Sequence, residues 1–231
     1  MAQDNRPQAQ QGTIGKFFSR TITVIVWLLF ALFMSIISEW IGMNFYWEDE
    51  GVRHSQEMVA DELKYLNEDF RKSLIVQKPV EYAKSFANVT NKYLFEKTGL
   101  TNFLIDTVRG TSAGDLSRVI ADHLLAAIFI CQVFAIRLAI LTLAMPAFFI
   151  FAAVAAVEGL AQRDIRKWSV GREHAGLYHH SKRIIPACLI APWVIYLAIP
   201  VSVHPNLVIL PFAIMFGIGV FMVTYLFKKY I

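Results

Sequence analysis

Charged residues are scarce in this sequence. They make up 17% of its 231 residues, against about 25% in an average soluble protein. Hydrophobic residues make up 56%, and the mean hydropathy is +0.47. A soluble domain of this size needs more polar surface to cover its core. The composition therefore favours a membrane protein and excludes a disordered chain, a fibre or a secreted disulfide scaffold.

Motifs that carry catalytic chemistry are also missing. The sequence contains no GxSxG, P-loop, HExxH, CxxC or glycine-rich nucleotide loop. The cluster that most resembles a metal site comprises Glu173, His174, His179 and His180. Its histidines include an adjacent pair, and its spacing matches no standard zinc site. We therefore expect a protein that is not an enzyme and that uses no metal or cofactor.

Four hydrophobic runs indicate an all-α membrane protein. A bilayer core about 30 Å thick requires roughly 20 apolar residues in a helix. The predicted helices are 17–38, 119–157, 184–203 and 207–227. Only His204, Pro205 and Asn206 separate the last two, which should therefore be antiparallel neighbours. Three prolines should kink the third span: Pro186, Pro192 and Pro200.

The second run is longer than one span requires. From Leu124 to Val157 it is apolar except for Gln132 and Arg137. We expect one long helix with its second half in the bilayer, begun by a capping box at Ser112 to Asp115. Arg137 should then snorkel at an interface or pair within an assembly.

Charge bias orients the four spans in the membrane. Basic residues are in excess in the tail 1–16, the loop 158–183 and the tail 228–231, and the positive-inside rule places all three in the cytoplasm. The first tail is polar and should be disordered. Residues 39–118 then form a periplasmic domain between the first and second spans.

That domain should be helical, because its apolar residues recur at helical spacing. One stripe comprises Val52, Val59, Leu63, Leu66, Phe70 and Leu74. After Lys78-Pro79 a second stripe comprises Tyr82, Phe86, Val89 and Tyr93, ending near Thr98-Gly99.

Two groups of residues are candidates for contacts with other molecules. The first combines charge, a glycine turn and aromatic rings, which favours partner docking over simple attraction to anionic lipids: Arg137, Glu158, Arg163, Arg166, Arg172, Glu173, Tyr178 and His179. The second has small residues four apart, which let helix backbones approach within the bundle or between subunits of a homo- or hetero-oligomer: Ala152, Ala155, Ala156 and Gly159.

The stretch from the second span through the basic loop resembles a known family. The runs RLAILTLAMPAFFIFAAVAAV and EGLAQRDIRKWSVGREHAGLYHHSKR are similar to four-span inner-membrane proteins of conjugative plasmids and integrating conjugative elements, including a TraJ-like component beside the coupling ATPase. Three features of the family are present. Arg137 matches an arginine that enters the second span, Pro146 matches a proline within that span, and Glu158-Gly159-Leu160 matches an acid-Gly-Leu motif where the span ends on the cytoplasmic side. The family usually has Asp as the acid of that motif and a small residue where His174 stands.

The resemblance implies a non-enzymatic component of a conjugative type IV secretion system. Its expected partners are the coupling ATPase and other secretion subunits, with anionic lipids at the basic loop and no direct contact with DNA. A small transporter or channel is the alternative from another class, although the first, third and fourth spans lack the ionisable residues of a polar pathway. An entry-exclusion protein is a third possibility.

The predicted topology is testable with reporter fusions. Fusions near Asn88 and His204 should report the periplasm, and fusions near Ser169 and Ile231 should report the cytoplasm. A cytoplasmic signal at Asn88 would overturn the orientation and the domain assignment together.

Overall fold

The computed structural model describes residues 13–69, 79–92, 99, 115–168 and 175–227. Most of these residues are helical, and there is no strand among them. Six helices follow in order: α1 Thr13–Phe45, α2 Val52–Asp69, α3 Pro79–Asn91, α5 Asp115–Lys167, α6 Ala175–Ala198 and α7 Pro205–Tyr225. Four of them, α1, α5, α6 and α7, are long and apolar enough to cross a membrane. The all-helical prediction with four apolar helices is confirmed.

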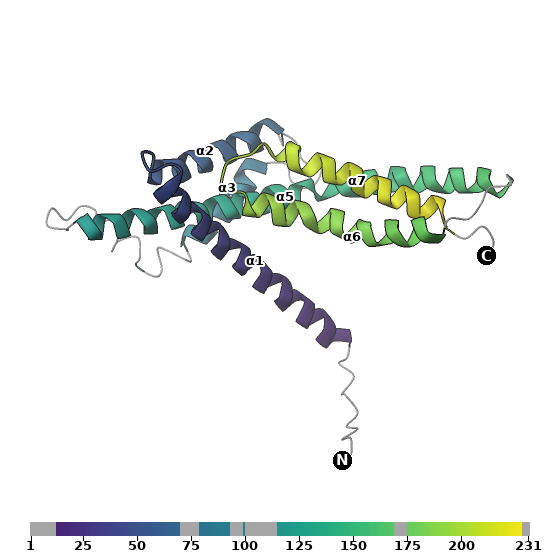
Figure 1. The fold of residues 1–231 in the computed structure, drawn as a ribbon, viewed down its shortest axis with the longest axis horizontal. Coiled ribbons are helices and arrows are strands. Elements are labelled where there is room, and N and C mark those ends of the chain that lie inside the picture. Colours follow the sequence, from purple (N-terminus) through teal and green to yellow (C-terminus); the bar gives the residue numbers. More distant parts are fainter. Residues whose placement is uncertain (1–12, 70–78, 93–98, 100–114, 169–174, 228–231) are drawn as a thin grey trace, which may run out of the picture.

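Helix α5 is the axis of the molecule. It has 53 residues, which corresponds to about 80 Å. Figure 1 shows α6 and α7 beside its carboxy-terminal half and α2 and α3 beside its amino-terminal half. Helix α1 contacts α5 and α6 near its own carboxy-terminal end and runs obliquely away toward the amino terminus.

One hydrophobic core joins the short helices to the apolar ones. Leu66 of α2, Ala83 of α3 and Ile140 of α5 are fully buried in it, together with Leu197 of α6 and Ala213 of α7. The inner part of the predicted α2 stripe, Val59, Leu63 and Leu66, packs on this core, whereas Phe70 and Leu74 lie outside the described residues. The α2–α3 pair therefore packs on the bundle and has no separate core of its own among the described residues.

The second stripe was predicted wrongly at Val89. That side chain is 55% exposed, and the buried face of α3 is formed by Tyr82, Ala83 and Ala87. Small alanines allow the helix to lie close to α5. The side chains of Phe86, Tyr93 and Thr98 lie outside the described part of the structure. Gly99 has a positive φ of 71°, but α3 already ends at Asn91.

Helix ends also differ from the predicted spans. Helix α1 begins at Thr13, inside the predicted tail, and α5 continues to Lys167, inside the predicted loop. Helix α6 contains Pro186 and Pro192 but ends at Ala198, so Pro200 follows the helix and does not kink it. A proline disfavours helical geometry in the residue before it. The predicted capping box lies outside the described residues except for Asp115.

Helices α5 and α7 approach each other closely at Gly159. A Cβ atom at this position would overlap Thr224 Oγ1 and would lie 2.9 Å from the carbonyl oxygen of Phe221. Small residues permit this kind of contact between apolar helices, where dispersion forces between well-fitted surfaces hold the pair together. Gly159, predicted as a helix-packing residue, thus packs within the chain.

Substitution of this glycine should therefore weaken the bundle. Gly159→Leu is expected to lower the free energy of unfolding by about 1–3 kcal/mol through overpacking, measured by thermal melting of the intact protein in detergent. Gly176→Leu is the control, because nothing lies within 4 Å of a Cβ atom there. Equal melting of both variants would contradict the close packing of α5 and α7.

Candidate functional site

A buried network around Arg137 connects three helices. Its Nε donates to Glu62 Oε1 of α2 over 2.8 Å, and both side chains are essentially inaccessible, at 1% and 0% exposure. Tyr196 of α6 donates its hydroxyl to Glu62 Oε2 over 2.5 Å. Glu62 therefore receives a hydrogen bond at each carboxylate oxygen.

Arg137 donates three further hydrogen bonds at and just after the end of α6. Nη1 donates to the carbonyl oxygens of Tyr196 at 3.1 Å and Ile199 at 2.6 Å, and Nη2 donates to that of Val201 at 2.7 Å. Tyr196 is one of the last four residues of α6, whose carbonyls have no partner within the helix and carry the negative end of its dipole, and Ile199 and Val201 follow the helix. A guanidinium, with five donors in a planar fork, can satisfy several carbonyls at once.

The structure gives Arg137 partners that the prediction did not include. Glu62 and the carbonyl oxygens of Ile199 and Val201 surround its guanidinium within one chain. Burial raises the pKa of Glu62, while the charge of Arg137 and the hydrogen bonds from Tyr196 and Arg137 lower it. The network can neutralise charge and fix three helices, but it offers no open surface to a docking partner.

Sequence reasoning missed Glu62, although the sequence carried a signal for it. Glu62 lies three residues after Val59 and four before Leu66, so it falls on the apolar stripe of α2. An acid on the buried face of one helix and a single arginine within an apolar run of another indicate an ion pair between them. The pairing itself requires that α2 folds back on α5.

A second polar cluster holds the junction of α1 and α2. His54 Nδ1 lies 3.1 Å from Glu39 Oε1, and the His54 ring stacks on Trp47 with centroids 4.0 Å apart. Trp47 in turn covers Gly42, where a side chain would collide with the indole. Glu39 is fully buried, so this cluster places an ionisable pair where α1 turns into α2.

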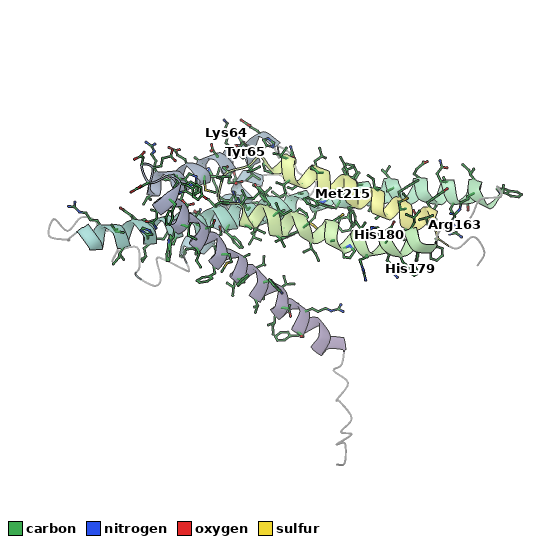
Figure 2. All side chains as sticks on the ribbon, in the orientation of Figure 1. Lys64, Tyr65, Arg163, His179, His180 and Met215 are labelled. Carbon is green, nitrogen blue, oxygen red and sulfur yellow. The ribbon has the colours of Figure 1, made fainter. Side chains whose placement is uncertain are left out.

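The opposite end of the bundle carries the predicted basic residues (Figure 2). The Arg163 guanidinium lies 5.4 Å from the centroid of the Phe227 ring, and that of Arg166 lies 4.7 Å from the centroid of Tyr225. Tyr178 packs edge-on against the same Phe227 ring. These arginines therefore hold the carboxy-terminal end of α7 by cation–π contacts, a role that the docking prediction did not include.

The other predicted residues are spread over this end of the bundle. Glu158 is exposed and accepts a hydrogen bond from Gln162 Nε2 over 2.9 Å. His179 and His180 are exposed on α6, whereas Arg172, Glu173 and His174 lie outside the described residues. Among the side chains that the structure describes, no three of the types that bind metals are grouped to hold an ion.

The Arg137 network generates a thermodynamic prediction. Arg137→Met leaves Glu62 buried without its cation, which is expected to cost about 3–5 kcal/mol. The double variant Arg137→Met/Glu62→Met removes both charges, so its loss should be smaller than the sum of the single losses, with a coupling of about 0.5–3 kcal/mol. Thermal melting and accumulation of the full chain in detergent measure both effects.

The exposed pair Arg53–Glu57 is the matched control for this cycle. Its atoms are 3.2 Å apart and its side chains are 67% and 62% exposed, so its coupling should stay below about 1 kcal/mol. Additive losses at Arg137 and Glu62 would show that the two charges do not depend on each other.

Comparison with known proteins identifies the family. Residues 46–228 match the family described as "IncC plasmid conjugative DNA transfer protein DtrJ-like", a range that begins directly after α1 and includes every other described helix. No curated protein and no solved structure matches the chain. The match covers well over half of the chain and confirms the resemblance to conjugative membrane proteins. The chain belongs to the DtrJ-like family of conjugative DNA transfer proteins.

Proposed function

We propose that this protein is a non-enzymatic inner-membrane component of a type IV secretion machine and that it associates with the coupling ATPase. The observation that carries the proposal is the family match over residues 46–228. The four apolar helices fit a multi-pass membrane protein. In the proposed orientation both termini are cytoplasmic and the α2–α3 pair is periplasmic.

The arrangement of charge supports a scaffold over a transporter. A transporter needs ionisable or polar groups along a path across several spans. Here the buried ion pair Arg137–Glu62 lies level with the carboxy-terminal end of α6, since Arg137 donates to the carbonyl of Tyr196 near that end and to those of Ile199 and Val201 just after it. The described part of α7 contains no Asp, Glu, Lys, Arg or His. The network thus joins helices at one end of the bundle and does not continue toward the other.

The end formed by Arg163, Arg166 and Tyr178 supports contact with a cytoplasmic or membrane-bound partner. Arg163 is only partly buried, and its guanidinium is engaged with the ring of Phe227, which fixes its position and lowers the entropy lost when a partner binds. Arg166 is buried against Tyr225 and supports this end of the bundle from within. Trp168 extends beyond them and is 93% exposed. Exposed aromatic residues beside basic ones are typical of protein interfaces and of membrane–water boundaries.

The decisive experiment is copurification from donor cells. The tagged, full-length protein, extracted in mild detergent, should bring down the coupling ATPase, and deletion of its gene should reduce transfer to background until a copy is supplied in trans. An inner-membrane protein of similar size with the same tag is the control for non-specific recovery.

The rival functions give different results. An entry-exclusion protein acts in the recipient, so expression there would reduce incoming transfer while its deletion in donors would leave transfer unchanged. A transporter would be active without the ATPase, and purified protein in liposomes would carry ions or solutes. Either result, with no recovery of the ATPase, would overturn the proposal.

A further inference from the structure

An apolar groove runs between α5 and α7 on the surface of the bundle. Val154, Ala155 and Glu158 line it from α5, and Ile214, Gly217 and Ile218 line it from α7. The edges are well exposed, at 65% for Val154 and 56% for Ile218. Figure 2 marks Met215, which follows Ile214, on the exposed side of α7.

The shape of the groove suits a helix. Its edge residues are four apart on each side, Val154 and Glu158 on one helix and Ile214 and Ile218 on the other, so they form parallel ridges. Ala155 and Gly217 lie between the ridges, and Phe151 and Phe221 also line the groove. Small residues such as Ala155 let a third backbone approach closely, and close packing is the main attraction between helices in lipid.

Glu158 adds a charge at one end of this otherwise apolar groove. It lies where α5 passes from its apolar run into the basic segment, at the end that the proposed topology places on the cytoplasmic side. Its carboxylate is exposed and bonded to the neutral amide of Gln162. Membrane helices carry Lys and Arg at their cytoplasmic ends, so a partner helix lying in the groove presents a cation to Glu158.

The exposed face of α5 continues past the groove. Val154, Glu158, Ala161 and Ile165 are spaced by four, three and four residues, so they lie on one face of the helix. Ala161 and Ile165 are exposed in a segment rich in charge, and Ile165 is 64% exposed. This face fits a partner helix that continues past the membrane into the cytoplasm, as α5 does.

We propose that this groove receives one transmembrane helix of a partner membrane protein, with a Lys or Arg at the helix's cytoplasmic end paired to Glu158. The inference rests on the proposed function and identifies the surface through which the coupling ATPase docks. A lipid acyl chain and a second copy of this chain are the other occupants, and the experiment distinguishes them.

Photo-crosslinking from the groove tests the occupant. A photoreactive phenylalanine analogue at Ile218 of the full chain should crosslink to the coupling ATPase in donor cells, and peptide sequencing should place the adduct in a transmembrane helix that ends in Lys or Arg. The same analogue at Ile190, which is 57% exposed on α6 outside the groove, should not. Two differently tagged copies reveal self-contact. Crosslinks to lipid alone or to the second copy would overturn the proposal.

Substitutions then test shape and charge separately. Ala155→Leu fills the space between the ridges and should reduce crosslinking and copurification by about tenfold or more, since that corresponds to 1.4 kcal/mol of binding energy. Ala153→Leu is the control, because Ala153 is exposed and does not line the groove. Glu158→Lys should cause a similar loss through like-charge repulsion, whereas Asp164→Lys, six residues on, should not.

Charge exchange completes the test. Replacing the partner's cytoplasmic Lys or Arg by Glu should restore crosslinking to Glu158→Lys. If the wild-type protein copurifies with the ATPase but Ala155→Leu and Glu158→Lys do so equally well, the groove assignment is wrong and the proposed function stands. If the wild type does not recover the ATPase at all, the proposed function fails first.

Discussion

The ion pair of Arg137 with Glu62 is the interaction on which the arrangement of this protein depends. A charge in the middle of an apolar helix is costly unless hydrogen bonds and an opposite charge surround it. Glu62 supplies the charge, and the carbonyls of Ile199 and Val201, just after the end of α6, supply further hydrogen bonds. Arg137 can be satisfied only when α2 lies on α5 and α6 ends beside it, so one residue couples the folding of three helices.

The length of α5 follows from the same arrangement. Its apolar run continues far past Arg137 toward the amino terminus, where lipid is not needed to cover it. Ile130 and Val133 are buried there against Met58, and Ala121, Ile128 and Cys131 are buried against α1 residues such as Ile36. The α2–α3 pair and the end of α1 thus cover apolar side chains of the first half of α5. About 20 helical residues are enough to cross a bilayer core, and these contacts give the rest of the long hydrophobic run other apolar surfaces to pack on.

Composition and periodicity were sufficient to predict what depends on local sequence. The four apolar helices, the hairpin turn at His204 and the inner stripe of α2 follow from hydrophobicity and spacing. The roles of Arg137, Arg163 and Arg166 did not follow, because each is decided by a partner that is distant in sequence: Glu62, Phe227 and Tyr225. Val89 was assigned by its hydrophobicity, yet the close contact of α3 with α5 selects alanines.

The internal use of charge also decides what remains for recognition. Arg137 is enclosed, and the guanidinium groups of Arg163 and Arg166 lie against aromatic rings. These three arginines therefore hold the bundle together. Glu158 is different, because it is exposed at the end of a groove whose other lining residues are apolar. In a bilayer, an apolar surface alone does not favour a partner helix over lipid, because lipid tails are equally apolar. In the proposed docking, specificity for the partner helix then comes from the fit of the groove and from the single carboxylate at its end.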